Sequence, residues 1–177
     1  MPEPSPADVS LLPDAGPLIT LAYARALDLL FKPGWQVMLV DMVLHEVTRS
    51  QTPTSQAIAA WAAEHALPVL PTRTFAHYRQ ASKAGASPRR SHLGELAIQE
   101  TLNDFALAAM PRTGVFLFED HKIARGSFLV PPCCRKVSTR AFLVYLEQKG
   151  LLDSAADVER RAIQAGRAFS RLRFPPE

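Results

Sequence analysis

The chain has 177 residues, 47% of them hydrophobic, and a formal net charge of +3 at pH 7. This length and composition fit one folded domain and exclude a disordered chain. The charge favours an anionic partner only weakly, because many proteins that never bind nucleic acid are equally basic. No run reaches the roughly 18 apolar residues needed to span a bilayer, so we expect no membrane partner.

The first half of the chain alternates short apolar runs with helical patterns, separated by Pro and Gly turn signals. Pro17 suits the first turn of a helix, where its missing N–H is not needed. Asp41 is a suitable N-cap for the next helix, and Thr54 or Ser55 for the one after it. The elements predicted here are strands over 9–12, 37–40 and 67–70 and helices over 17–30, 42–49 and 54–65.

The second half begins with a polar loop over 83–90 and a long helix predicted over 91–109. Apolar residues of that helix recur at spacings of three and four, which places them on one face. The other elements predicted here are strands over 114–118 and 127–130 and helices over 121–125, 138–148 and 154–171. Of these, the strand over 127–130 is the most weakly marked.

Strands that alternate with helices predict βαβ units and an α/β fold. The apolar runs do not alternate with polar residues, which indicates strands covered by helices on both faces. We therefore predict a three-layer α/β/α sandwich around a mostly parallel sheet of four to five strands. We expect residues 1–8 to form a disordered or extended tail, 9–150 the domain, and 151–177 a helical extension packed on it.

The N-terminus and the cysteines predict the compartment. Residues 1–10 show neither the basic nor the apolar region of a signal peptide, so we expect none. Cys133 and Cys134 are neighbours in sequence, and a bridge between them would strain the peptide that joins them. A cytoplasmic location is the expectation that follows.

Four acidic residues are expected at one edge of the sheet. Asp14 follows the first predicted strand and Asp120 the fourth, while Glu46 lies in the helix after the second strand. Glu95 lies in the first turn of the helix before the fourth strand and begins its apolar stripe. Ligands of open α/β sheets bind beyond the carboxyl ends of the strands, so these four side chains are candidates for one site.

Carboxylates that converge repel one another, and a divalent cation relieves that repulsion. Oxygen-only ligands suit Mg²⁺ or Mn²⁺ better than zinc. Each acid alone also has a structural explanation. Asp14 and Asp120 could cap helices, Glu46 could be a solvated helix residue, and Glu95 could favour the helix dipole. The joint placement of the four is what favours a metal site.

Four short motifs resemble those of the PIN-domain family over residues 9–144. Residues 14–19, Asp-Ala-Gly-Pro-Leu-Ile, resemble its opening motif, and 43–47, Val-Leu-His-Glu-Val, its second. Residues 94–98, Gly-Glu-Leu-Ala-Ile, resemble the third motif. Residues 116–125, an apolar strand followed by an acidic pair and a helix ending in Ala-Arg, resemble the fourth. The order and spacing of the four also match the family.

The resemblance implies a metal-dependent ribonuclease that hydrolyses phosphodiester bonds, with Asp14, Glu95 and Asp120 holding Mg²⁺ or Mn²⁺ and Glu46 completing the site. It also implies a VapC-type toxin, with an antitoxin protein and a second copy of the chain as partners. The sequence differs from many members at Phe118, where they carry Thr or Ser, and at Gly16, where they carry Ser or Asn. These differences keep a second hypothesis open, a PIN-like module that binds RNA or protein without cleavage.

Cations flank the acids in sequence and are candidates for substrate phosphates. Arg89 and Arg90 precede Glu95, and Lys122 and Arg125 follow Asp120. Each of the four cations could equally be an ordinary solvated residue. The basic segment 167–173 could contact RNA, an antitoxin or a second subunit, or simply be an exposed helix end.

Other α/β functions fit less well. A receiver domain typically needs an acidic pair after the first strand, but Ala15 follows Asp14. The eight glycines form neither a dinucleotide-binding motif nor a phosphate-binding loop, and no nucleophile elbow is present. The five histidines show no metal-binding spacing, so we expect surface or capping positions for them.

Overall fold

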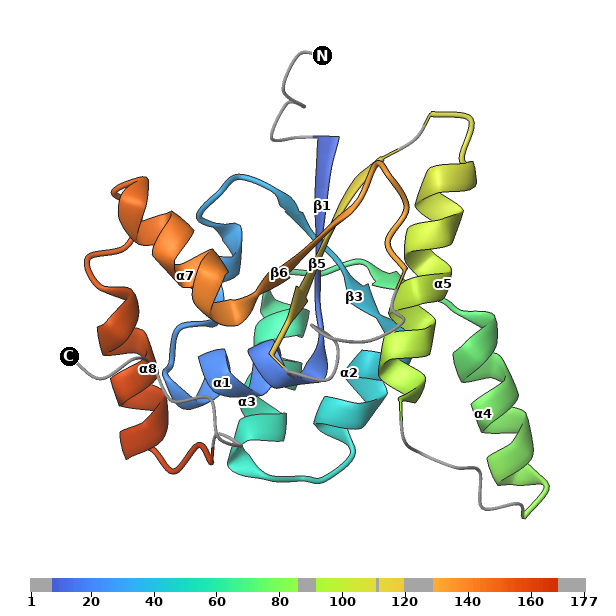
Figure 1. Ribbon diagram of the computed structural model, residues 1–177. Helices are drawn as coiled ribbons and strands as arrows, with labels where there is room; N and C mark the ends of the chain where they lie inside the picture. Colours follow the sequence, from blue (N-terminus) through green and yellow to red (C-terminus); the bar gives the residue numbers. More distant parts are fainter. Residues whose placement is uncertain (1–7, 86–91, 111, 120–128, 169–177) are drawn as a thin grey trace.

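The structure, a computed structural model, describes residues 8–85, 92–110, 112–119 and 129–168 (Figure 1). At its centre is a parallel sheet in the order β2-β1-β5-β6, and a second small sheet pairs β3 with β4, also in parallel. The strands are β1 (Val9–Pro13), β2 (Gln36–Val37), β3 (Leu39–Val40), β4 (Val69–Leu70), β5 (Thr113–Phe118) and β6 (Arg135–Ser138). The predicted α/β fold with a mostly parallel sheet is confirmed.

Helices cover the sheet on both faces, as the three-layer sandwich predicts. They are α1 (Ala15–Tyr23), the 3₁₀ helix η2 (Leu27–Phe31), α2 (Asp41–Thr48), α3 (Pro53–Glu64), α4 (Arg73–Lys83), α5 (Leu93–Leu107), α7 (Thr139–Gln148) and α8 (Ala155–Gln164). In Figure 1, α7 and α8 lie on one side of the sheet and α4 and α5 on the other. None of the described helices combines the length and apolar character that crossing a bilayer requires.

The core explains why the central strands are uninterrupted apolar runs. Leu11 and Leu12 of β1 and Phe116 and Leu117 of β5 are each fully buried, although successive side chains point to opposite faces. Both faces of these strands are therefore covered, which only a layer of helices on each side can achieve. Val158 of α8 belongs to the same core, so this part of the C-terminal segment packs with the rest.

Several elements differ from the sequence prediction. The strand expected over 37–40 is divided between β2 and β3, which belong to different sheets. The helix expected over 17–30 is divided, because α1 ends at Tyr23 and Arg25 turns the chain with a φ of 51° before η2 begins. The fifth strand, expected over 127–130, is instead β6, and the described Leu129 and Val130 are not in a strand. Since β6 is an edge strand with exposed Arg135 and Lys136, it has no apolar run to reveal it.

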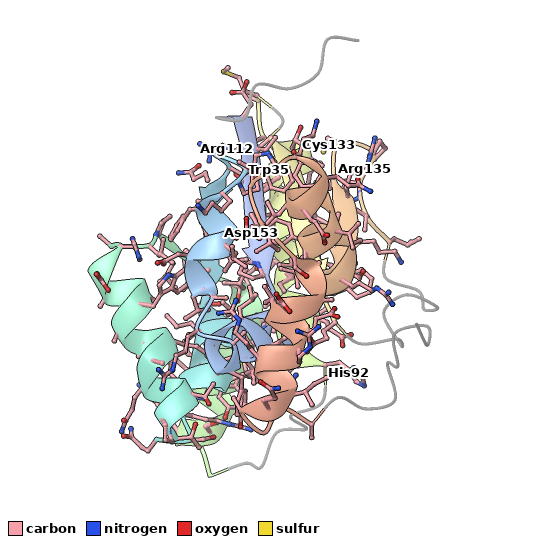
Figure 2. The ribbon with its side chains drawn as sticks, turned by 90° about the vertical axis from the view of Figure 1, so that its left-hand side faces the viewer. Trp35, His92, Arg112, Cys133, Arg135 and Asp153 are labelled. Carbon is pink, nitrogen blue, oxygen red and sulfur yellow. The ribbon has the colours of Figure 1, made fainter. Side chains whose placement is uncertain are left out.

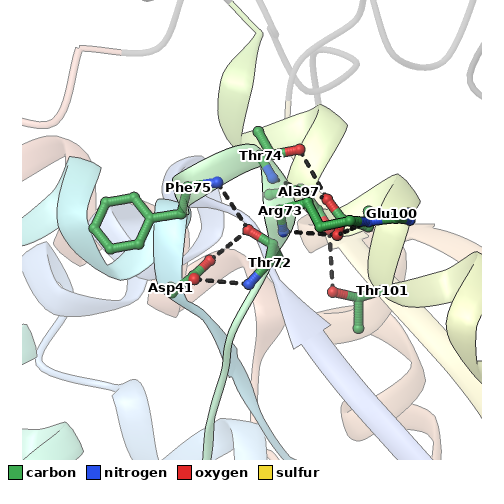
Figure 3. A network of polar contacts seen from close by, with 8 residues as sticks. All are labelled: Asp41, Thr72, Arg73, Thr74, Phe75, Ala97, Glu100 and Thr101. Carbon is green, nitrogen blue, oxygen red and sulfur yellow. Dashed lines mark hydrogen bonds and ion pairs between the residues drawn. The ribbon is translucent and has the colours of Figure 1, made fainter. Parts of the chain in front are cut away.

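Helix α4 is the element that the sequence did not predict. Phe75 and Tyr78 pack partly against the core, but none of the residues of α4, all of which the structure describes, is fully buried. Polar contacts also hold its first turn. Thr72 caps the helix by accepting a hydrogen bond from the N–H of Phe75, and both the N–H and the hydroxyl of Thr72 donate to Asp41 (Figure 3). Asp41 was expected to cap α2, but Val40 is the N-cap residue and Asp41 is the first residue of the helix. The Asp41 carboxylate accepts the hydrogen bonds from Thr72 that hold the start of α4.

Candidate functional site

The carboxyl ends of β1 and β5 lie side by side and carry an acidic residue each. Asp14 directly follows β1, and its N–H donates to the carbonyl of Leu117 at 2.9 Å. Glu119 directly follows β5. Asp14 is partly buried and occupies the N-cap position of α1, but its side chain accepts no capping hydrogen bond from the described backbone of that helix. Helix capping therefore does not explain this aspartate.

Glu46 of α2 and Glu95 of α5 are brought together across the junction of their helices. The Glu46 carboxylate lies against Gly94 in the first turn of α5, and the backbone there lowers the pKa of Glu46. A Cβ at position 94 would stand 2.8 Å from Oε2 of Glu46, so a side chain there would force that carboxylate to move. Glycine at this position therefore lets the Glu46 carboxylate lie beside the backbone that carries Glu95.

The electrostatics of Glu46 match those of an acid in a shared site. Burial raises the pKa of Glu46 above its ordinary value, and the negative charge of Glu95 adds to this. The positive charge of the exposed Arg49 and the N–H of Gly94 offset only part of the increase. Glu95 keeps 27% of its side chain exposed, and Nδ1 of His92 lies 3.4 Å from its carboxylate. A divalent cation between two such acids would favour their charged forms.

This acidic pair lies at the carboxyl end of the sheet. Figure 2 shows His92, next to the pair, at the opposite end of the molecule from Arg112, which precedes the amino end of β5. The end that carries His92 is thus the end at which β1 and β5 finish, where Asp14 and Glu119 lie. The edge expected to gather the acids from their places in sequence therefore carries Asp14, Glu46 and Glu95.

Glu119 is held in a closed set of polar contacts. Thr20 of α1 donates to one carboxylate oxygen at 2.7 Å, and Arg167 donates to the other at 2.6 Å. Arg167 also donates to the Thr20 hydroxyl at 2.9 Å. Gly16 leaves the space for this arrangement, since a Cβ there would stand 2.8 Å from that of Glu119. The glycine that distinguishes this chain from the PIN motif is therefore required by the position of Glu119.

The turn after α8 places Arg167 at this acid. The prediction continued this helix to 171, but it ends at Gln164, and Gly166 adopts a φ of 100°. Hydrogen bonds of 2.9 Å from Gly166 to the carbonyl of Ile163 and from Arg167 to that of Ala162 form a Schellman motif. The motif turns the chain back toward α1. Arg167 is thus engaged inside the molecule and is not the exposed cation that the basic segment suggested.

Several predicted site residues lie outside the described residues. They are Arg89, Arg90, Asp120, Lys122 and Arg125. The short helix predicted over 121–125 lies there as well. Among the residues that the structure does describe, no group of three or more His, Cys, Asp or Glu side chains could hold a metal ion. Asp14, Glu46 and Glu95 are the members of the candidate centre that the structure describes.

The structure adds three residues that sequence reasoning did not select. Arg49 lies one helical turn after Glu46, a spacing that could have identified it. Thr20 and Thr139 have no such signal, because tertiary packing alone brings them to the carboxyl end of β5. The buried Thr139 hydroxyl donates to the carbonyl of Phe118 at 3.2 Å. The first residue of α7 therefore supplies a hydroxyl near the position where Phe118 lacks one.

Comparison with known proteins gives no relative. The chain matches no protein-family model, no curated protein and no solved structure. The resemblance to PIN domains thus stays a prediction from four short motifs.

Proposed function

We propose that the protein is a metal-dependent ribonuclease that hydrolyses phosphodiester bonds in RNA. The observation that carries the proposal is the placement of the Glu46 carboxylate against the turn of α5 that carries Glu95, at the carboxyl end of a parallel sheet, with the pKa of Glu46 raised by burial and, to a smaller extent, by Glu95. An acid with a raised pKa in such a place is typical of functional sites.

The donor set suits a hard divalent cation. Carboxylate oxygens are the ligands that Mg²⁺ and Mn²⁺ prefer, and Glu46 has no fixed partner stronger than an exposed arginine and one N–H among the described residues. Asp14, Glu95 and Asp120 would hold the ion and Glu46 would complete the site. A bound ion would supply a Lewis acid that activates a water molecule and stabilises charge on the phosphate.

The protein's own residues contribute positioning and charge. Gly94 leaves room for the Glu46 carboxylate against the first turn of α5. Arg49 is exposed beside Glu46 and can pair with a phosphate of the substrate. Thr20 and Arg167 bind both oxygens of Glu119, which leaves this acid a structural role at the end of β5.

The test is RNA cleavage with Mn²⁺ by Glu46→Gln and Glu95→Gln, with Asp153→Asn as the matched control. Asp153 is exposed and belongs to the segment between α7 and α8 (Figure 2). The proposal predicts at least a hundredfold loss in the two glutamine variants, since each removes a metal ligand, and no loss in the control. Equal activity in all three variants would refute it.

A second candidate is a PIN-like module that binds RNA or a protein without cutting. The observation that favours it is Phe118, which is buried and packs on Phe116 with ring centroids 5.8 Å apart. An apolar ring therefore occupies a position at which many PIN domains carry a hydroxyl. Binding of RNA without Mn²⁺-dependent cleavage would favour this candidate. A toxin role with an antitoxin partner belongs to the first proposal and is tested by whether expression of the chain arrests growth unless Glu46 is replaced.

A further inference from the structure

Helix α4 carries cations and no acids. Its sequence from Arg73 to Lys83 contains two arginines, a lysine and a histidine, and neither Asp nor Glu. Arg79 and Lys83 are exposed and lie one helical turn apart, so they share a face. Arg73 is the exception, because it pairs with Glu100 of α5. The outer part of α4 is therefore a positively charged surface.

Aromatic rings lie among these cations. Phe75 and Tyr78 are partly exposed, and their rings stack with an interplanar angle of 13° and centroids 6.2 Å apart. The guanidinium of Arg79 lies over the Phe75 ring at 5.9 Å. We call Phe75, Tyr78, Arg79 and Lys83 the α4 face. Aromatic rings interleaved with cations are the combination that binds single-stranded nucleic acid, through stacking of bases and pairing with phosphates.

The α4 face is fixed at one end. Glu100 accepts hydrogen bonds from the N–H groups of Arg73 and Thr74, from the Arg73 guanidinium and from the Thr74 hydroxyl (Figure 3). Thr72 caps the same turn. These contacts hold the first turn, and Phe75 and Tyr78 pack partly against the core while Arg79 and Lys83 are exposed. The first turn of α4 is thus held by polar contacts, while the side chains of the α4 face stay at least partly exposed to solvent.

His45 joins the α4 face to the acidic pair. Its ring centroid lies 5.3 Å from those of both Phe75 and Tyr78, and the next residue of α2 is Glu46. Helix α4 also packs against both α2 and α5, the helices that carry Glu46 and Glu95. A strand of nucleic acid lying on the α4 face would therefore lie beside the elements that form the candidate centre.

We infer that the α4 face binds single-stranded RNA and guides it to the edge that carries Glu46 and Glu95. The inference rests on the proposed function, whose substrate it describes. Phosphates would pair with Arg79 and Lys83, and a base would stack on Tyr78. An acidic protein segment could also pair with Arg79 and Lys83, but its carboxylates would not stack on the rings of Phe75 and Tyr78 as a nucleic-acid base would. The rings are thus what favours RNA over a protein partner.

Binding is measured with the full chain and a fluorescein-labelled 12-mer oligouridylate by anisotropy in EDTA, so that no cleavage occurs. Arg79→Ala combined with Lys83→Ala should weaken binding at least tenfold and reduce the slope of log K against log salt by about 1.4, or about 0.7 per lost phosphate contact. Lys149→Ala is the matched control, since its ammonium lies over Tyr145 at the same 5.9 Å but on α7, across the sheet from α4 (Figure 1). It should change neither quantity.

Tyr78→Leu tests the stacking separately, because leucine keeps the apolar bulk and removes the ring. It should weaken binding of oligouridylate by about tenfold and leave binding of an abasic ribose-phosphate 12-mer unchanged. Circular dichroism melting checks that each variant is folded. Polyglutamate of equal charge serves as the competing probe. It should bind more weakly than oligouridylate and be insensitive to the loss of the ring.

The inference is overturned if the wild type does not bind oligouridylate, or if the α4 variants bind it as well as Lys149→Ala does. It is also overturned if polyglutamate binds equally well and Tyr78→Leu affects neither probe, which would assign the face to an acidic protein segment. Failure of the ribonuclease proposal is distinguishable, since cleavage with Mn²⁺ is scored on the same proteins. Binding through α4 without any cleavage would contradict that proposal and leave this inference standing.

Discussion

Arg167 is predicted to anchor the C-terminal segment to the acidic edge, and Arg167→Met measures that role. The side chains of Arg167 and Glu119 are only 21% and 12% exposed. Methionine keeps most of the apolar bulk but leaves the Glu119 carboxylate with Thr20 as its remaining described hydrogen-bond donor. Breaking a fully buried pair costs about 3–5 kcal/mol and an exposed pair at most about 1 kcal/mol. For this intermediate burial we expect about 2 kcal/mol of lost stability.

The control comes from the same part of the chain. Arg160 of α8 pairs with Asp157, and their side chains are 61% and 57% exposed. Arg160→Met should therefore cost less than about 0.5 kcal/mol. In urea unfolding the two variants should differ in midpoint with similar slopes, because both unfold the same surface. In thermal unfolding, Arg167→Met should lower Tm by about 4–8 °C for a domain of this size.

A second substitution separates the ion pair from packing. Adding Glu119→Gln to Arg167→Met removes the carboxylate that was left without its cation, so part of the lost stability should return. Equal unfolding midpoints for Arg167→Met and Arg160→Met would refute the reasoning, because the contacts of the Arg167 side chain with Glu119 and Thr20 would then contribute nothing. A double variant less stable than Arg167→Met would also contradict it.

Two further predictions concern the neighbouring acids. Gly94→Ala should lower Mn²⁺-dependent cleavage at least tenfold, because its Cβ would displace the Glu46 carboxylate, while Tm stays within about 2 °C since alanine favours the helix. Lost stability without lost cleavage would contradict this. Glu159 is 6% exposed, and burial raises its pKa to about 7, with a contribution from Glu119 and a partial offset from Arg140. The folded state thus binds the proton more tightly than the unfolded state does, so stability should fall by up to about 3 kcal/mol as the pH rises from 4.5 to 7. Glu159→Gln should abolish that decline in urea unfolding, and an unchanged pH profile would refute the assignment.

The central sheet could be predicted because its signal is local. The apolar runs that became β1 and β5 are buried on both faces, and the apolar stripe of α5 buries Ile98 and Leu102. Helix α4 and strand β6 could not be predicted this way, since neither buries an apolar run. The first turn of α4 depends on Glu100 of α5, which is distant in sequence and accepts four hydrogen bonds from Arg73 and Thr74.

The candidate site also contains residues whose place could be predicted from the sequence and others whose place could not. Asp14 could be placed from the end of β1 alone, and Glu46 and Glu95 from their helices. The role of Glu119 could not, because it depends on Arg167, 48 residues later, and on Thr20, 99 residues earlier. Motif resemblance alone could not explain why positions 16 and 94 are glycine. In the structure, Glu119 occupies the space that a side chain at Gly16 would need, and Glu46 the space that one at Gly94 would need.

The most direct test of the central claim is a calorimetric titration of Mn²⁺ into the wild type, Glu46→Gln and Asp14→Asn, with Asp153→Asn as control. The proposed site predicts binding by the wild type and the control, and at least tenfold weaker binding by the other two variants. Because burial and Glu95 raise the pKa of Glu46, protons should compete with the ion at a higher pH than for an ordinary glutamate. No binding by the wild type, or equal binding by all four proteins, would contradict the claim that these acids form a metal centre.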